Sequence, residues 1–173
     1  MVEWSNGRVV VWSNGRVVEA GHPRARLTEG IHLWEEDKMN IVVENAQGRV
    51  PVTILALHGD LDGSNYQEVI AKAHDLYGAG TRHLLLDMSD TPYMSSAGLV
   101  ALHSVILLLR GEQPPDPESG WSAFHAIARE QSGVQKAVKL LNPQARVRRT
   151  LEVSGMQEFF EVYTDRQVAV ESF

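Results

Sequence analysis

The stretch Val50–Tyr77, VPVTILALHGDLDGSNYQEVIAKAHDLY, joins two kinds of hydrophobic periodicity. Its first part, Val50–His58, is rich in Val, Ile and Leu, which predicts a buried strand. In its second part the apolar residues recur at helical spacing, and Ser64 can cap the helix. The residues of this apolar face are Tyr66, Val69, Ile70, Ala73 and Leu76. Gly78 and Gly80 predict the end of the helix, so a strand leads directly into an amphipathic helix.

The same alternation continues on both sides of this stretch. Further strands are predicted at Ile41–Glu44, Arg82–Asp87, Gln135–Leu141 and Phe159–Tyr163. Further helices are predicted from Ser95 or Ser96 to Arg110, from Asn142 as N-cap with Pro143 to Gly155, and from Asp165 onward with Thr164 as cap. The order ββαβαβαβα predicts an α/β domain, in which helices cover an open mixed sheet. Right-handed crossovers would place the helices on one face of the sheet if the winding never reverses.

Composition excludes several classes of protein. The chain has 173 residues, of which 43% are hydrophobic and 22% charged, and it contains no cysteine. Disulfide scaffolds, thiolate metal sites and cysteine nucleophiles are therefore excluded. The net charge is −6 and no basic stripe is present, which argues against direct nucleic-acid binding. The longest apolar stretch, Leu99–Leu109, is too short to span a membrane, and no signal peptide is visible, so we expect a cytoplasmic protein.

Two segments lie outside the strand–helix alternation. Residues 1–38 form an N-terminal extension with a tandem repeat of WSNGRVV, at Trp4–Val10 and Trp12–Val18. Each copy centres on Asn-Gly, a hairpin turn signal, which predicts a three-stranded meander with type I′ turns. Its strands would be Val2–Ser5, Arg8–Ser13 and Arg16–Glu19. The alternatives are a disordered arm, or a segment upstream of a true start at Met39.

The second such segment is an insertion at residues 111–133 of the domain that we assign to residues 39–173. Its first part is loop-like, with three prolines between Gly111 and Gly120. Trp121, Phe124, Ile127 and Ala128 then fall at the spacing of a short amphipathic helix.

No enzyme motif is found, so we expect no catalytic residue, no metal and no cofactor. The chain lacks G-x-S-x-G, the phosphate-binding G-x-x-x-x-G-K-[ST], and H-E-x-x-H. Its seven histidines are scattered. The segment from His58 to Ser64 fails as a calcium loop, because Asn65 and Ala71 stand where glycine and glutamate are required. A basic cluster, Arg146, Arg148 and Arg149, is interpreted as a solvated helix face.

Two polar segments follow predicted strands: Gly59–Asp62 and Tyr93–Gly98. Open α/β sheets bind their ligands and partners where strand ends meet helix starts. Taken alone, Ser95 and Ser96 are helix caps, and Asp60 and Asp62 are turn and cap residues.

Taken together, these segments resemble the STAS domain of bacterial anti-sigma factor antagonists. The family's G-E-L-D-like turn is matched by Gly59–Asp62, its L-D-L strand by Leu85–Asp87, and its serine signature by Tyr93–Leu99 (YMSSAGL). Its downstream pattern, with V-R-R-x-L-E-x-S-G before an aromatic strand, is matched between Leu141 and Tyr163. The resemblance covers about residues 39–173, in the family's order.

This resemblance implies a protein-binding switch rather than an enzyme. In the family, the serine before the [SATG]-G dipeptide is phosphorylated by a partner that is both anti-sigma factor and kinase, and a phosphatase resets it. That serine is Ser96 here. Ser95 is the alternative site, since this chain has a second serine where many relatives have aspartate before the phosphorylated serine. The implied partner surface comprises Asp60, Asp62, Met94, Ser95, Ser96, Ala97, Gly98 and Leu99. We expect a monomer or weak homodimer.

Two other functions stay open. A STAS-type scaffold or ligand-sensing module would never be phosphorylated, and its serines would be caps. A serine hydrolase would need a base, and no base is placed by the sequence.

Overall fold

The computed structural model describes residues 2–5, 8–13, 16–19, 39–114 and 133–173. The chain divides into two compact units, Met1–Leu33 and Trp34–Phe173. In the first unit, the strands β1 (Val2–Ser5), β2 (Arg8–Ser13) and β3 (Arg16–Glu19) pair antiparallel in that order, at the predicted bounds. The two Asn-Gly turns, the cluster at Trp121–Ala128 and most of the predicted insertion lie outside the described residues.

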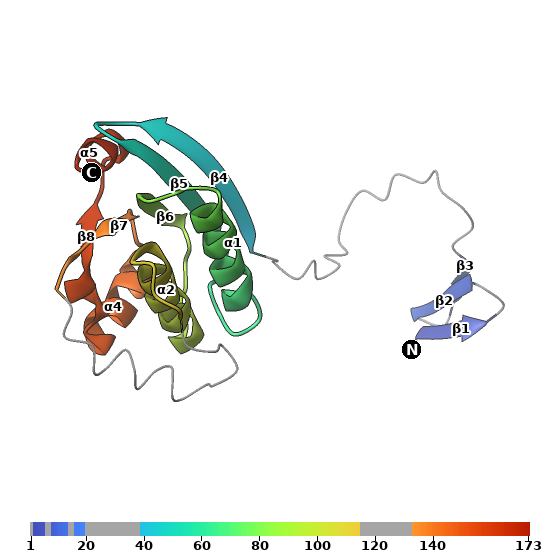
Figure 1. The fold of residues 1–173 in the computed structure, drawn as a ribbon. Coiled ribbons are helices and arrows are strands. Elements are labelled where there is room, and N and C mark those ends of the chain that lie inside the picture. Colours follow the sequence, from blue (N-terminus) through green and yellow to red (C-terminus); the bar gives the residue numbers. More distant parts are fainter. Residues whose placement is uncertain (1, 6–7, 14–15, 20–38, 115–132) are drawn as a thin grey trace. The chain divides into compact units, whose positions relative to one another are not determined.

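The second unit is built on a five-stranded sheet in the order β4-β5-β6-β7-β8 (Figure 1). Its strands are β4 (Asn40–Gln47), β5 (Pro51–His58), β6 (Leu84–Asp90), β7 (Gln135–Leu141) and β8 (Phe160–Tyr163). The β4–β5 pair is antiparallel and the other pairs are parallel. The predicted fold class, a mixed sheet with the order ββαβαβαβα, is therefore confirmed. A short 3₁₀ helix, η2 (Met156–Phe159), was not predicted.

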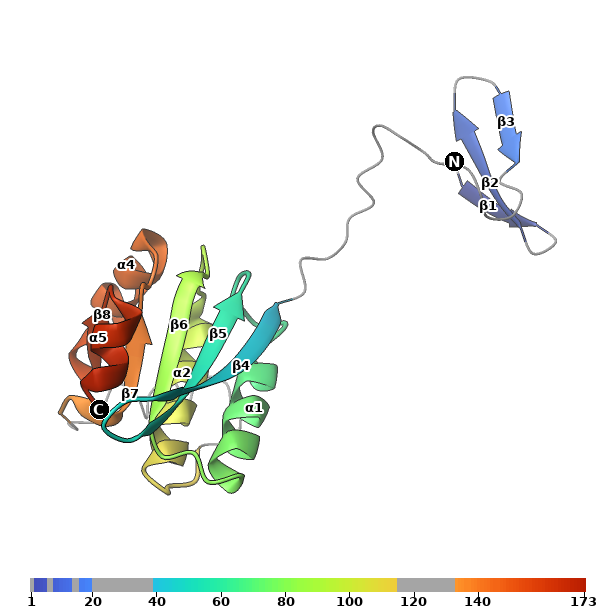
Figure 2. The same ribbon diagram turned by 90° about the horizontal axis from the view of Figure 1, so that it is seen from above.

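In the described part of the chain the helices are α1 (Tyr66–Gly78), α2 (Ser96–Leu109), α4 (Ala145–Ser154) and α5 (Arg166–Glu171). The three crossover helices α1, α2 and α4 lie on one face of the sheet, and α5 lies on the other (Figures 1 and 2). The strand order never reverses, so right-handed crossovers keep their helices on one face. The expectation of a single covered face is wrong for α5, which follows the last strand and is no crossover.

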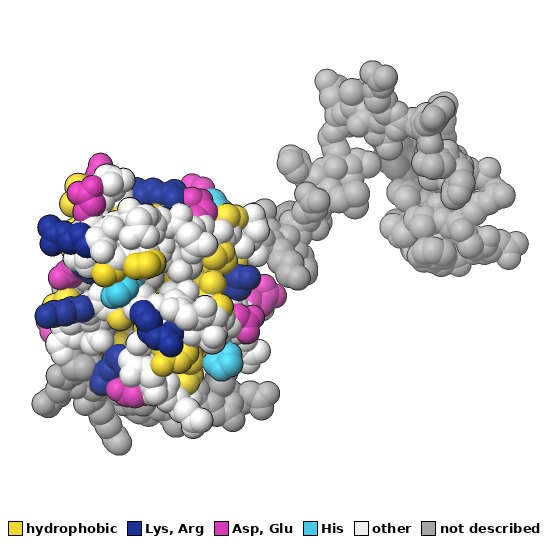
Figure 3. Space-filling view, turned by 45° about the horizontal axis from the view of Figure 1, so that its top comes forward, with side chains coloured by type: hydrophobic (Ala, Val, Ile, Leu, Met, Phe, Trp, Pro, Cys, Tyr) yellow, Lys and Arg dark blue, Asp and Glu magenta, His cyan; other side chains and the backbone are white. Residues whose placement is uncertain are grey.

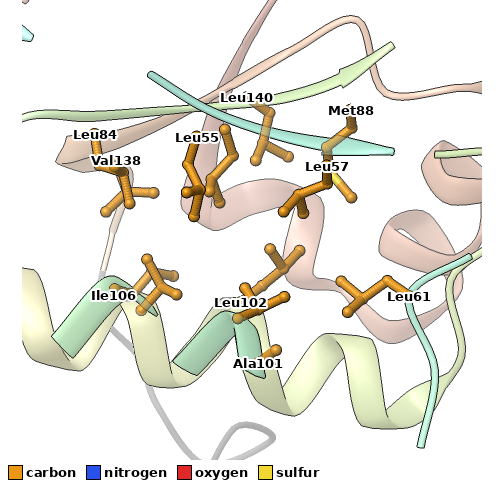
Figure 4. Packing of buried hydrophobic residues seen from close by; sticks show 14 of the residues in the cluster. Leu55, Leu57, Leu61, Leu84, Met88, Ala101, Leu102, Ile106, Val138 and Leu140 are labelled. Atoms are coloured by element: carbon orange, nitrogen blue, oxygen red, sulfur yellow. The ribbon is translucent and has the colours of Figure 1, made fainter. Parts of the chain in front are cut away.

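Each face of the sheet has its own core. On the crossover-helix face, leucines of β5 and β6 meet residues of α2 such as Leu102 and Ile106 (Figure 4). On the other face, α5 covers a smaller cluster: Val52, Ile54, Leu85, Leu141, Ala169 and Val170. Eleven of the fourteen residues of α2 are buried, and the helix has no charged residue. This burial fixes α2 firmly against the sheet.

Three predicted helix caps, Ser64, Asn142 and Thr164, are wrong, because each helix begins one or more residues later than predicted. The helix after Ser64 begins beyond Asn65, because the Ser64 amide and hydroxyl both donate to the Asp62 carboxylate. Asn142 has a φ of 48°, so the chain has not yet entered α4 there.

The N-cap of α4 is Gln144, and neither Asn142 nor Pro143 belongs to the helix. At α5 the cap is Asp165 rather than Thr164, since Asp165 Oδ1 accepts a hydrogen bond from the Val168 amide at 2.8 Å. The predicted end of α4 at Gly155 is confirmed by its φ of 75°.

Charges of both signs are interspersed on the face shown in Figure 3, without a continuous basic surface. Among the described residues, no helix is long and apolar enough to cross a bilayer. Within the same residues, no group of three or more potential ligand side chains is arranged to hold a metal ion.

Candidate functional site

The two polar segments singled out in the sequence meet at the carboxyl ends of β5 and β6. Leu61 and Met94 form an isolated parallel bridge. The Leu61 amide donates to the Tyr93 carbonyl at 3.0 Å, and the Ser95 amide donates to the Leu61 carbonyl at 2.9 Å. Leu61 and Met94 are both buried. These main-chain bonds join the acidic loop after β5 to the serine turn after β6 as one unit.

Gly98 makes the close approach of these segments possible. A Cβ built on Gly98 would lie 2.4 Å from Met94 Cγ, 3.0 Å from Leu61 Cγ and 3.1 Å from the Leu61 carbonyl oxygen. Real side chains do not approach so closely. Glycine is therefore required at position 98 because there is no room for a Cβ. Its φ is outside the left-handed region, so backbone conformation is not the reason.

The two adjacent serines have different roles in the structure. Ser95 is the N-cap of α2, and its hydroxyl accepts a hydrogen bond from the Ala97 amide at 3.2 Å. Ser96 is the first residue of the helix and is exposed. Its hydroxyl makes no hydrogen bond within the described part of the chain. Ser95 is half-buried and engaged in capping, whereas Ser96 presents a free hydroxyl to solvent.

The acidic side of the site is organised around Asp62. Its Oδ1 accepts hydrogen bonds from the Ser64 hydroxyl at 2.6 Å and the Ser64 amide at 2.8 Å. These two bonds lower the pKa of Asp62 below its ordinary value. The carboxylate is therefore ionised at neutral pH and held in one orientation.

Asn65 fixes the loop from inside. Its side chain is buried, accepts a hydrogen bond from the Asp62 amide at 3.0 Å and donates to the Asp60 carbonyl at 2.8 Å. Its side chain therefore closes the turn instead of capping α1. Asp60 is exposed, so the loop presents two carboxylates beside the serine turn.

A hollow of about 580 Å³ adjoins this loop. It is lined by Asn40, His58, Gly59, Asp60, Asp62, Ser64, Asn65, Asp90 and Pro92. On its wall, His58 Nδ1 lies 2.9 Å from Asp90 Oδ2. Sequence reasoning did not select His58 or Asp90 for this site, because the pairing of β5 with β6 brings them together. It did not select Asn65, whose side chain is held by contacts within its own loop.

The residues predicted to form the partner surface do come together, but with unequal exposure. Asp60 and Ser96 are exposed, and Asp62, Ser95 and Ala97 are half-buried. Met94, Gly98 and Leu99 are buried and hold the turn from below. Sequence reasoning missed Tyr93, whose side chain is 43% exposed beside the turn. The sequence contained a signal for Tyr93, since this aromatic residue is the first of the serine signature Tyr93–Leu99.

A third element flanks the serine turn. The Thr150 hydroxyl of α4 donates to the Met94 carbonyl at 3.3 Å, and Gln144 Nε2 donates to the Ser89 carbonyl at 2.7 Å. The site therefore has an acidic loop on one side and the start of α4 on the other.

Comparisons with known proteins agree with this geometry. Residues 44–113 match the family model of the STAS domain. No curated protein matches the sequence significantly. This match over residues 44–113 agrees with the resemblance to the STAS domain that was inferred from the motifs.

Solved structures show which proteins share the fold. An anti-sigma factor antagonist from Mycobacterium paratuberculosis superposes with a TM-score of 0.53 and 16% identity, over 78% of this chain and 93% of that one. A putative anti-sigma factor antagonist from Thermotoga maritima gives a TM-score of 0.55 and 17% identity, over 76% and 92%. The fold of this chain is thus similar to that of anti-sigma factor antagonists.

Proposed function

We propose that this protein is an anti-sigma factor antagonist controlled by phosphorylation of Ser96. In its unphosphorylated form it binds an anti-sigma factor that is also a serine kinase, and so frees a sigma factor for transcription. The observation that carries the proposal is the exposed Ser96 hydroxyl in the first turn of α2, beside Asp60 and Asp62. The similarity of the fold to known antagonists supports it.

The proposed docking surface consists of Asp60, Asp62 and the segment Met94–Leu99. Asp60, Asp62, Ser95, Ser96 and Ala97 make contact with the partner, while Met94, Gly98 and Leu99 keep the turn in position. The remaining partner is a serine phosphatase that resets the switch. The protein acts by binding rather than catalysis, in the cytoplasm, as a monomer or weak homodimer.

The proposed switch is electrostatic and steric. The kinase transfers the γ-phosphoryl group of ATP to the Ser96 hydroxyl, releasing ADP and a proton. Phosphate adds about 1.5 to 2 negative charges at neutral pH. On a surface that already carries Asp60 and Asp62, this charge repels an acidic patch of the partner and is costly to desolvate. A change of about 3 kcal/mol would weaken binding more than a hundredfold.

The fold is expected to persist after phosphorylation. The N-cap hydrogen bond belongs to Ser95, and the buried faces of α2 do not include the Ser96 side chain. Phosphate at the start of a helix is also favourable, because it meets the positive end of the helix dipole. The change in affinity is therefore expected without a change in secondary structure.

The experiment pairs two serine variants that differ only in position. Purified wild type, Ser96→Ala and Ser95→Ala are incubated with a recombinant anti-sigma factor kinase and ATP, and phosphate incorporation is measured by mass spectrometry. We expect wild type and Ser95→Ala to be phosphorylated and Ser96→Ala to remain unmodified. Phosphate that persists in Ser96→Ala would show that the site is wrong.

Binding provides the second measurement. The affinity of Ser96→Asp for the kinase is compared with those of wild type and Ser96→Asn by calorimetry. The negative charge of aspartate should weaken binding, whereas asparagine, of similar size, should not. Equal affinities of all three proteins would refute the switch.

A second candidate function is a ligand-sensing module that is never phosphorylated. The hollow of about 580 Å³ beside Asp60 and His58 favours it, because its volume is that of small-molecule sites. Protein isolated from its native cell under several stresses should then carry no phosphate. A metabolite that raises the melting temperature of wild type but not of His58→Ala would support this function.

A further inference from the structure

The first turn of α4 carries a concentration of positive charge that the fold does not explain. Arg146, Arg148 and Arg149 are all exposed. Within the described residues their one ion pair joins Arg149 to Glu152, at 3.6 Å, and the Arg149 side chain is 76% exposed. Cations at a helix N-terminus oppose the helix dipole and are mildly unfavourable. The cluster therefore adds no stability to its own helix.

Contacts of Thr150 and Gln144 place the first turns of α4, which carry this cluster, against the segment before the serine turn. The Thr150 hydroxyl bridges the Met94 carbonyl, at 3.3 Å, and the Arg146 carbonyl, at 3.1 Å. One residue before α4, Gln144 reaches the Ser89 carbonyl at the end of β6. Met94 is two residues before Ser96. The first turns of α4 therefore lie against the segment that leads into α2.

Helix geometry distinguishes the three arginines. Residues four apart lie on the same face of a helix, so Arg146 shares the face of Thr150, which contacts the serine turn. Arg149, three residues after Arg146, lies next to it on the solvent side of the helix, opposite the buried face. The buried face is marked by Val147 and Leu151. At about 100° per residue, Arg148 lies on the opposite flank of that buried face.

We propose that Arg146, assisted by Arg149, is the intramolecular counterion of a phosphate on Ser96. This inference rests on the proposed function, since it concerns the same phosphate. Guanidinium groups bind phosphate through charge-assisted hydrogen bonds, and phosphorylation commonly orders a site by creating such pairs. The phosphate would lie between two unlike neighbours, with Asp60 and Asp62 on one side and Arg146 on the other. Attraction to Arg146 would draw it toward α4.

The pairing has a consequence for the switch. Ordinary phosphoserine has a second pKa of about 6, so part of the population is monoanionic near neutral pH. A nearby arginine favours the dianion and lowers that pKa, whereas Asp60 and Asp62 raise it. Arg146 would therefore maintain the full charge of the modified site against the two carboxylates. At the same time, the phosphate would neutralise the positive charge of Arg146 beside the proposed docking surface.

The test does not require the kinase. Phosphoserine is installed at position 96 of the full-length chain by genetic encoding, and its second pKa is measured by ³¹P NMR titration. Arg146→Gln should raise that pKa by about 0.5 to 0.8, the effect in water of one unit charge at the roughly 4 to 5 Å separation of a hydrogen-bonded ion pair. Arg148→Gln is the matched control, since it removes the same charge from the same helical turn. It should change the pKa by less than about 0.1, because it lies on the far flank.

The melting temperature supplies a second measurement, because Arg146→Gln should affect the unmodified and the phosphorylated protein differently. In the unmodified protein, Arg146→Gln should leave the melting temperature unchanged or raise it, because a cation leaves a helix N-terminus. In the phosphorylated protein the same substitution should lower it. A pKa that responds equally to Arg146→Gln and Arg148→Gln, or not at all, would overturn the inference.

The outcomes also separate this inference from the proposed function. If the installed phosphate abolishes kinase binding but its pKa ignores Arg146, the switch stands and the counterion fails. If the pKa follows Arg146 but no kinase modifies Ser96, the counterion geometry stands and the proposed regulation fails.

Discussion

Replacing Gly98 by alanine tests whether close packing beneath the serine turn holds the site together. In an ordinary helix interior this substitution is favourable, because alanine exceeds glycine in helix propensity by about 1 kcal/mol. At Gly98 the added methyl group would lie 2.4 Å from Met94 Cγ and 3.1 Å from the Leu61 carbonyl oxygen. The Met94 side chain can move, but the Leu61 carbonyl also accepts the Ser95 amide and is held in place.

The two effects have opposite signs and can be weighed. Overpacking of a close-packed interior costs about 1 to 3 kcal/mol. Subtracting the gain in helix propensity of about 1 kcal/mol leaves a net destabilisation of up to about 2 kcal/mol. For a chain of this size, that upper value corresponds to a fall in melting temperature of roughly 4 to 8 °C. The serine turn should move as well, since the clash is with the residues that hold it.

Gly78→Ala is the matched control for this substitution. Gly78 is the last residue of α1, has no positive φ, and a Cβ there would meet nothing within 4 Å. Gly78→Ala should therefore be neutral or stabilising. Both variants are measured by urea unfolding, followed by far-UV circular dichroism. A Gly98→Ala variant as stable as Gly78→Ala would refute the packing argument.

Three further predictions concern other parts of the domain. Ser95→Ala removes the N-cap of α2 and should cost about 0.5 to 2 kcal/mol in urea unfolding; Ser96→Ala, without a hydrogen bond to lose, should stay within about 0.5 kcal/mol. Lys139→Met should lower the free energy of unfolding by about 1 to 3 kcal/mol in the same assay. The buried Lys139 ammonium donates hydrogen bonds to the Ser172 carbonyl and hydroxyl, at 3.0 and 2.9 Å, and lies 2.7 Å from Glu161 Oε2. A cost no larger than that of an exposed lysine would contradict it. The hydrogen bond from Lys139 lowers the pKa of Glu161 in the folded protein below its ordinary value of 4.5. Ionised Glu161 therefore stabilises the fold fully above pH 4.5, and this stabilisation is lost as the pH falls through the lowered pKa. Thermal melts of Glu161→Gln should accordingly show a weaker loss of stability below pH 4.5 than wild type, by a modest amount because the Glu161 side chain is 41% exposed.

Most of the fold was predictable because its signals are local. Runs such as Val50–His58 predict strands from side-chain type, and the spacing of Val69, Ile70 and Ala73 predicts a helix. The observed element order confirms both. Helix caps were the weak point, since a cap depends on which polar group reaches a free amide. Asn65, for example, uses its side chain to close the loop behind it instead of capping α1.

The candidate site was predictable in part. The motifs selected the acidic loop and the serine turn and favoured Ser96 over Ser95 by resemblance, but they could not say what either hydroxyl contacts. The structure separates them, because one hydroxyl accepts the Ala97 amide and the other is exposed. The pairing of His58 with Asp90 was also beyond the sequence, since 32 residues separate them along the chain.

Local sequence was sufficient to predict the alternation of strands and helices, the two polar segments at strand ends, and the likeness to the STAS family. Each of these depends on residue type and spacing within a short window. Three features could be seen only in the folded chain: Gly98 lets Leu61 and Met94 meet, Ser96 is exposed whereas Ser95 caps α2, and the first turns of α4, which bear the arginines, lie against the serine turn. The physical reason is that these relations arise from the parallel order of β5, β6 and β7, which brings loops distant in the chain to one edge of the sheet.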